Sequence, residues 1–176
     1  RNNEGNALPE RYVGVVHVKG VSVMRDYYND PKSTADVLKD GWLDTGDMGY
    51  LLDGNIYIVG RAKDMIIVNG KNHWPQDIEW AAEQVEGMRN GDVAAISVPG
   101  ENQEELPMLL AHCRFSDPAE RIKFAEQMKK HVQKITGVTC LVELVPPRSL
   151  PRTSSGKLSR AKARSQYLDG KLKLAG

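Results

Sequence analysis

The spacing of the apolar residues changes along this chain, and the change limits the folds that the chain can adopt. Before residue 75 the apolar residues form short runs that are rich in β-branched side chains, such as residues 12–18. Asp53-Gly54 and Asn69-Gly70 follow such runs, and both dipeptides are typical of tight turns. From Pro75 onward, segments with helical spacing alternate with further strand-like runs. The sequence therefore predicts the edge of a β-rich domain followed by a compact α+β domain, with a boundary near residues 60–64.

Strands and helices are expected at definite positions. We expect strands at residues 12–18, 48–52, 55–59, 65–68, 93–98, 108–115 and 141–145. Helices are expected at residues 32–39, from Pro75, from Pro118 and from Ser159. In the third of these helices we expect Asp117 as the cap, Gly137 after the end, and one apolar stripe made by Ile122, Ala125, Met128, Val132 and Ile135.

Composition excludes several classes of protein. Hydrophobic residues make up 40% of the chain and charged residues 27%, which argues against disorder. No apolar run is long enough for a membrane span, and the net charge of +1 gives no nucleic-acid signature. Cys113 and Cys140 lie far apart, which excludes a disulfide scaffold and predicts a cytoplasmic protein.

Two motifs near the expected boundary could bind a nucleotide. Residues 42–47 (Trp-Leu-Asp-Thr-Gly-Asp) place the Asp47 carboxylate beside a glycine, where it could accept hydrogen bonds from ribose hydroxyls. Taken alone, this motif fits an Asx turn at the start of a strand better than a nucleotide site. Residues 60–64 (Gly-Arg-Ala-Lys-Asp) offer the Arg61 guanidinium to hydroxyls or phosphate, or form a solvated charged link.

Two further motifs present other polar groups. Residues 69–77 (Asn-Gly-Lys-Asn-His-Trp-Pro-Gln-Asp) read as a turn that leads into a helix, and His73 has no second ligand at metal spacing, so no metal site is expected. Residues 151–158 (Pro-Arg-Thr-Ser-Ser-Gly-Lys-Leu) lack the first glycine and the final Ser or Thr of a P-loop. They form a flexible loop that presents Lys157, or the start of a solvated basic tail.

In this order and spacing, the four motifs resemble the adenylate-forming superfamily, which includes acyl-CoA synthetases, luciferases and the adenylation domains of peptide synthetases. The resemblance extends from about Tyr12 to about Tyr167. Residues 69–79 are most similar to the fatty acyl-AMP ligases. The resemblance implies that residues 1–62 are the end of the large N-terminal adenylation domain. It also implies that residues 63–176 are a small mobile domain with a mainly antiparallel sheet flanked by helices.

The resemblance also implies roles for single residues. Asp47 and Arg61 would bind the ribose of ATP, and Lys157 would be the catalytic lysine that reaches the α-phosphate and the attacking carboxylate. Lys63 or Asp64 would be the hinge about which the small domain turns between two half-reactions. Gly70 would lie in the loop along which the acceptor thiol approaches.

The implied activity is that of a ligase which activates a fatty acid with ATP and Mg²⁺ as acyl-AMP. The acyl group would pass to the phosphopantetheine thiol of an acyl carrier protein, or to CoA if the enzyme is an acyl-CoA synthetase. A non-catalytic module that docks a carrier protein is the third possibility, because residues from Arg152 onward include seven basic residues and one acid. The chain starts at Arg1 and lacks the family's phosphate-binding loop and acyl pocket, so we expect a fragment that is inactive alone.

Overall fold

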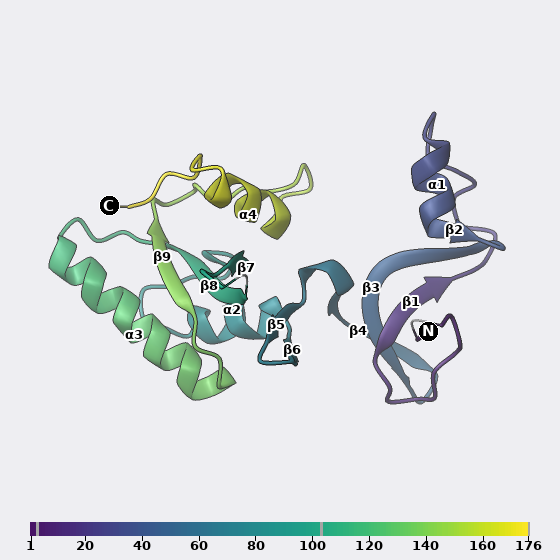
Figure 1. Ribbon diagram of the computed structural model, residues 1–176, viewed down its shortest axis with the longest axis horizontal. Helices are drawn as coiled ribbons and strands as arrows, with labels where there is room; N and C mark the ends of the chain where they lie inside the picture. The colour runs from purple at the N-terminus through teal and green to yellow at the C-terminus, as the bar shows by residue number, and fades with distance from the viewer. Residues whose placement is uncertain (3, 103, 176) are drawn as a thin grey trace. The chain divides into compact units, whose positions relative to one another are not determined.

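The computed structural model describes residues 1–2, 4–102 and 104–175, and the chain divides into two compact units (Figure 1). The first unit is Arg1–Lys63 and the second is Asp64–Gly176. No helix among the described residues is long and apolar enough to cross a membrane.

The first unit is built around one long central strand, β3. Strand β1 pairs with β3 along one edge, and β2 and β4 share the other edge, all antiparallel to β3. The helix expected at residues 32–39 ends earlier, because Leu38 and Lys39 pair with Leu43 and Trp42 of β3 instead. The elements of this unit are β1 (Gly14–Val18), α1 (Pro31–Val37), β2 (Leu38–Lys39), β3 (Trp42–Leu52) and β4 (Asn55–Arg61), and the 3-10 turn η1 (Ala62–Asp64) follows.

Asp53-Gly54 closes the hairpin that the sequence predicts. Asp53 and Gly54 have φ values of 49° and 74°, and the residues before and after them, Leu52 and Asn55, are paired. Positive φ at both central residues is the geometry of a type I′ turn, whose twist suits two antiparallel strands. Asp40-Gly41 closes the β2–β3 hairpin in the same way.

The second unit contains a three-stranded sheet with the order β7-β8-β9. Strands β7 and β8 are antiparallel, whereas β8 and β9 are parallel and are connected through α3. A small β5–β6 hairpin precedes α2. The predicted α+β class, with mainly antiparallel sheets and helices, is confirmed. The elements are β5 (Ile66–Val68), β6 (Lys71–His73), α2 (Pro75–Glu83), β7 (Val93–Pro99), β8 (Glu105–His112), α3 (Pro118–Thr136), β9 (Leu141–Val145) and α4 (Arg160–Leu168).

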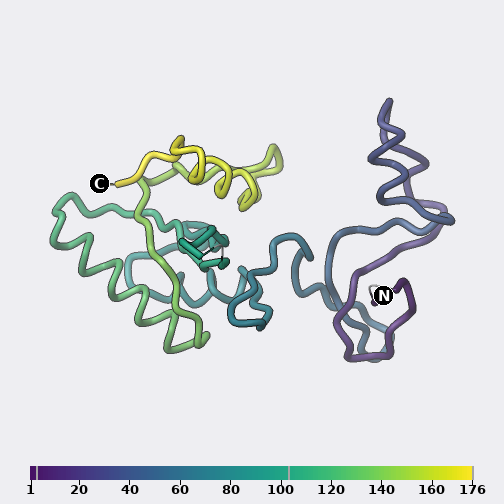
Figure 2. Tube along the Cα trace, viewed as in Figure 1, coloured from purple at the N-terminus to yellow at the C-terminus, as the bar shows by residue number. Residues whose placement is uncertain are grey.

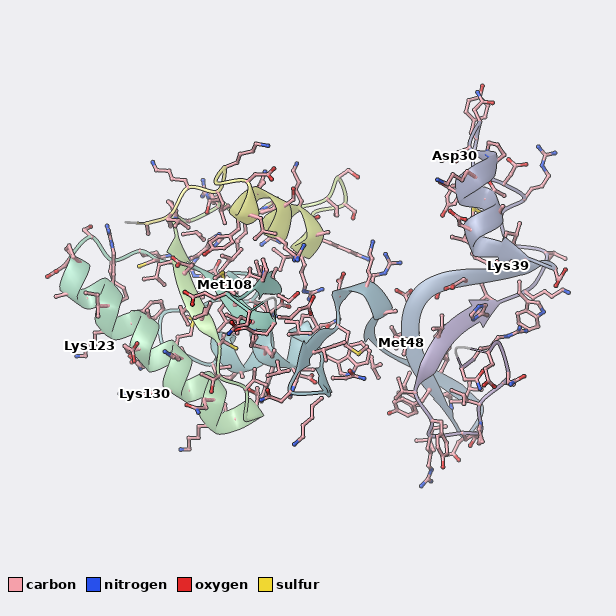
Figure 3. The ribbon with its side chains drawn as sticks, in the orientation of Figure 1. Asp30, Lys39, Met48, Met108, Lys123 and Lys130 are labelled. Carbon is pink, nitrogen blue, oxygen red and sulfur yellow. The ribbon has the colours of Figure 1, made fainter. Side chains whose placement is uncertain are left out.

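Helices cover both faces of this sheet (Figure 1). Val93 and Ala95 of β7 face α2 and α3, whereas the alternate residues Ala94 and Ile96 face α4. Met108, labelled in Figure 3, is buried in the core on the α4 side. The sheet is therefore apolar on both faces, and α4 is needed to cover one of them.

Helix α3 has both of the caps that the sequence predicts. The Asp117 carboxylate accepts a hydrogen bond from the Ala119 amide at 2.8 Å, Pro118 occupies the first turn, and Gly137 ends the helix with φ of 73°. The predicted apolar stripe was partly wrong. Ile122 is 68% exposed, and Phe124 is buried with Met128 and Val132 instead. Ile122 lies about 120° around the helix from Met128, at about 100° per residue, and so points away from the sheet.

The packing of Met128 should contribute much of the free energy that stabilises α3 against the sheet. The side chain is 0% exposed, so Met128→Ala is expected to lower the free energy of unfolding by about 2–5 kcal/mol through lost burial and a cavity. Ile122→Ala on the same helix is the matched control and should change it by less than about 0.5 kcal/mol. Urea unfolding followed by circular dichroism measures both. Equal losses in the two variants would contradict the assignment of the buried face.

Candidate functional site

The strand register of the first unit brings Asp47 and Arg61 together. A β-bulge between Met48 and Gly49 shifts the β3–β4 pairing by one residue, so that Asp47 lies opposite Arg61. The Arg61 Nε donates to Asp47 Oδ1 at 2.7 Å, and Nη2 donates to the Thr45 carbonyl at 3.1 Å. Both side chains keep solvent access, 35% for Asp47 and 48% for Arg61. Two residues from separate motifs thus form one exposed polar pair.

The turn before Asp47 leaves its carboxylate available. An Asx turn is present in this motif, but Asp44 makes it, because the Gly46 amide donates to Asp44 Oδ1 at 2.8 Å. Thr45 Oγ1 donates to the Val16 carbonyl at 2.8 Å and accepts from the Asp47 amide at 3.1 Å. The backbone around Asp47 is therefore fixed by neighbouring side chains, and the Asp47 side chain is not used for the turn.

The loop that carries Lys157 is held by hydrogen bonds within itself. It precedes α4 and projects beyond the start of that helix (Figure 2). The Thr153 amide donates to the Lys157 carbonyl at 2.7 Å, and the Lys157 amide donates to Thr153 Oγ1 at 3.1 Å. Gly156 has φ of 82°, which this tight turn requires. The Lys157 side chain is exposed, and in the part of the chain that the structure describes its ammonium has no partner.

Arg160, at the start of α4, joins two carboxylates that are distant in sequence. Its Nε and Nη2 donate to the two oxygens of Glu79 at 2.7 and 2.6 Å, a two-point ion pair. Its Nη1 donates to Asp64 Oδ2 at 3.3 Å, and Glu79 Oε1 also accepts from the Ala95 amide at 2.9 Å. We call Asp64, Glu79 and Arg160 the Arg160 cluster. The Glu79 hydrogen bonds, followed by the attraction of Glu79 and Asp64, raise the pKa of Arg160 despite its burial.

The structure distinguishes the two candidate hinge residues. Asp64 is 13% exposed and belongs to the Arg160 cluster, whereas the Lys63 side chain is exposed. The boundary between the two compact units lies between these two residues in the chain. Asp64 is thus attached to the second unit by its side chain, and Lys63 is not.

Gly70 lies at the tip of the β5–β6 hairpin. Asn69 and Gly70 have φ values of 50° and 74°, so this turn too is of type I′. Both residues are exposed, and a Cβ added at Gly70 would meet no atom within 4 Å. The tip is open space, which is compatible with a loop along which a ligand passes.

The sequence analysis missed Glu79 and Arg160. The sequence offers one signal for Glu79, because this acidic residue directly follows the apolar Ile78 within the expected helix. In the structure Glu79 is only 8% exposed. A buried carboxylate needs a cation or hydrogen-bond donors. Nothing in the sequence shows that its partner is Arg160, which is 81 positions later.

The cysteines and the possible metal ligands among the described residues form no further reactive or metal site. Cys113 and Cys140 are both buried, and burial raises the pKa of Cys140 to about 12, so its thiol is unreactive at neutral pH. Among residues 1–2, 4–102 and 104–175, no three His, Cys, Asp or Glu side chains gather as metal ligands do.

Known proteins resemble this chain in sequence and in fold. A protein of Caulobacter vibrioides that carries the name acyl-CoA synthetase is 48% identical over 172 residues, which are 97% of this chain and 30% of that protein. One of the fatty acyl-adenylate ligases of E. coli and L. pneumophila is 43% identical with a TM-score of 0.84, over 97% of this chain and 30% of its own. The McyG A-PCP structure, complexed with phenylalanyl-adenylate, is 31% identical with a TM-score of 0.88. The match covers 97% of this chain and 27% of the McyG chain. No family model matches the chain.

The chain corresponds to the C-terminal portion of the adenylate-forming enzymes. The resemblance that the four motifs predict is confirmed, and the chain spans about 30% of the length of the curated relatives it matches. These adenylate-forming relatives include both acyl-CoA synthetases and acyl-AMP ligases by name. The roles predicted for Asp47, Arg61, Lys63, Asp64, Gly70 and Lys157 stay predictions.

The Arg160 cluster should contribute more to the free energy of unfolding than an exposed ion pair does. Arg160→Ala leaves two carboxylates, 10% and 13% exposed, without their cation, and is expected to lower the free energy of unfolding by about 3–5 kcal/mol. Arg164→Ala is the control on the same helix, since Arg164 is exposed and, among the described residues, donates only to the Ser97 carbonyl. It should cost about 1 kcal/mol. Chemical unfolding measures the free energy of unfolding of both variants. Equal losses would show that the Arg160 cluster contributes no more to stability than the single hydrogen bond of Arg164.

Proposed function

We propose that this chain is the C-terminal part of an ATP-dependent ligase that activates a fatty acid as acyl-AMP. In this proposal residues 1–62 complete a large adenylation domain. The burial pattern supports this, because in the described part of residues 1–63 no hydrophobic side chain is buried, whereas Tyr12, Ile56 and Ile58 are more than half exposed. A sheet of this kind needs an apolar partner surface to be stable.

The presentation of Lys157 is the observation that carries the proposal. Adenylation brings a carboxylate to the α-phosphate of ATP, so negative charges approach one another in the transition state. A positively charged group held nearby stabilises that arrangement. The Lys157 ammonium is exposed and unpaired among the described residues, on a loop whose backbone is closed by hydrogen bonds. It can therefore bind an incoming anion without first breaking an ion pair.

Asp47 and Arg61 are proposed to bind the ribose of ATP. A carboxylate accepts hydrogen bonds from the two ribose hydroxyls, and the neighbouring guanidinium supplies donors to the sugar oxygens. Their 2.7 Å ion pair fixes the carboxylate while both side chains keep solvent access. Mg²⁺ is proposed to bind together with ATP in the whole enzyme, since this ion is usually held by substrate phosphates and one or two carboxylates. Among the described residues of this chain, no three possible metal ligands gather, so the chain by itself is not expected to bind the ion.

The junction at Lys63 and Asp64 is proposed as the hinge. Because Asp64 is held by Arg160, backbone rotation is expected on the Lys63 side of the junction. Arg160 also follows the Lys157 loop by three residues, so the hinge end and the catalytic loop share one anchor. A rotation of the second unit would then carry Lys157 away and present another surface, with Gly70, to the acceptor thiol.

The acceptor of the acyl group is proposed to be the phosphopantetheine thiol of an acyl carrier protein. The support is the similarity to fatty acyl-adenylate ligases and to the A-PCP structure. CoA is the alternative acceptor, favoured by the relative named acyl-CoA synthetase. Both acceptors carry the same thiol group, and the chemistry of the described residues suits either.

Replacing Lys157 should abolish most of the adenylation activity of an enzyme that carries this chain after its large domain. Lys157→Ala is expected to lower the rate of acyl-AMP formation by about a hundred- to a thousandfold, since one stabilising donor is lost. The change should fall on kcat more than on KM. Lys173→Ala, another exposed lysine, is the control and should leave the rate unchanged. Pyrophosphate release measures the rate, and normal activity of the Lys157 variant would refute the assignment.

The same enzyme also tests the acceptor. Preformed acyl-AMP is mixed either with CoA or with a carrier protein that bears phosphopantetheine, and its loss is followed by chromatography. We expect consumption by the carrier protein and persistence with CoA. Rapid consumption by CoA would instead make the enzyme an acyl-CoA synthetase.

The 176-residue chain alone is expected to form no acyl-AMP, and robust activity of that chain would refute the proposed division of the domains.

A further inference from the structure

The second unit has a large pocket that the roles above do not use. Its volume is about 1030 Å³, and it lies where the start of β7, the end of β8, the segment after β9 and α4 come together. Five cationic side chains line it together with one carboxylate, that of Asp92. The five are Arg89, Arg114, Arg148, Arg152 and Lys162.

The one carboxylate of the pocket is already engaged. Asp92 Oδ2 accepts from Arg114 Nη2 at 2.8 Å, and Asp92 Oδ1 pairs with His112 Nδ1 at 3.0 Å. Burial by itself would raise the pKa of Asp92, but the hydrogen bonds from Arg114 and His112 outweigh it and lower the pKa, so the group is ionised at neutral pH. The other cations face the pocket without a compensating acid among its lining residues, in a chain whose net charge is only +1.

Some of the cations are held in place and others are available. The Arg152 guanidinium donates to the carbonyls of Gly91 and Gly156 at 2.9 and 3.0 Å, which fixes it at the edge of the pocket. The side chains of Arg89, Arg148 and Lys162 make no hydrogen bond or ion pair with any described residue. Such donors, placed around one concavity, can bind an anion with little loss of existing contacts.

His112 gives a second and independent indication of a ligand. The side chain lines the pocket and is only 5% exposed. Its Nδ1 faces Asp92, and its Nε2 is buried without a hydrogen-bond partner among the described residues. Buried ring nitrogens are normally paired, so an unpaired one marks a position where a bound water or ligand completes the network.

We propose that this pocket binds a compact anion with several negative charges, of the phosphate type, for which inorganic pyrophosphate is the probe. The number of uncompensated cations matches a ligand with three or four charges better than a single carboxylate. The forked guanidinium groups of arginine also suit phosphate oxygens. A pocket favours a compact ligand over the acidic surface of a partner protein. Because Arg152 also holds the Gly156 carbonyl, the anion would lie beside the Lys157 loop.

The 176-residue chain itself is the material for the test. Calorimetric titration with sodium pyrophosphate should show one saturable site, with weaker binding of orthophosphate and none of acetate. Replacing Arg89 and Arg148 together by Ala should weaken binding about tenfold or more, because two donors to a charged ligand are lost. Lys162→Ala, a separate variant, should weaken it as well. The ring signals of His112, followed by NMR, should shift during the titration.

The matched control removes the same charge elsewhere. Lys123 and Lys130 are exposed on the outer side of α3, away from the sheet (Figure 3). Replacing both by Ala should leave pyrophosphate binding within twofold of the original. Three results would overturn the proposal: no saturable binding, equal weakening by the two double variants, or binding of hexaglutamate as tight as that of pyrophosphate. The last would indicate a surface for an acidic protein.

Discussion

The ion pair between Arg160 and Glu79 is the interaction on which the functional parts of the second unit depend. It connects the start of α4 to α2, and the Ala95 amide, which also donates to Glu79, links it to the edge strand β7. Asp64 joins the same guanidinium, so the first residue of the unit and the loop before α4 share one anchor. A partly buried arginine that pairs with two carboxylates is stabilising only while all of its partners are present. Its geometry therefore fixes the orientation of the neighbouring loop as well as the fold.

Features that depend on neighbours in the sequence could be predicted. Asp53-Gly54 forms the expected hairpin, Asn69-Gly70 forms the expected turn, and Asp117 and Gly137 delimit α3, because each of these signals acts over a few residues. Strand β6, which follows Asn69-Gly70, is not among the expected strands. The strand β2 has only two residues and exists through its pairing with β3. No local pattern identifies such a strand, so the sequence predicts residues 38–39 as part of a helix.

The geometry of the candidate site also depends on strand pairing that no local sequence pattern predicts. The two-residue turn at Asp53-Gly54 alone would place Asp47 opposite Gly60, and it is the bulge next to Met48 that moves Arg61 into that position. The motifs indicate both residues separately, whereas their 2.7 Å contact depends on a β-bulge that no sequence pattern predicts. The Arg160 cluster is still harder to predict, since Glu79 and Asp64 lie 81 and 96 positions before Arg160 in the sequence. Long-range pairs of this kind follow from the packing of the whole unit.

The position of α4 on the sheet has a consequence for the order in which the protein matures on the ribosome. Ala163 and Leu172 complete the core that also contains Ala94 and Ile96 of β7. Parallel pairing of β8 with β9 also has to wait until all of α3 has been synthesised. Domains of this size fold as cooperative units once enough of the chain has emerged. Lys157 is therefore translated before α4, and the core on the α4 side of the sheet is completed only after α4 and Leu172 have left the exit tunnel.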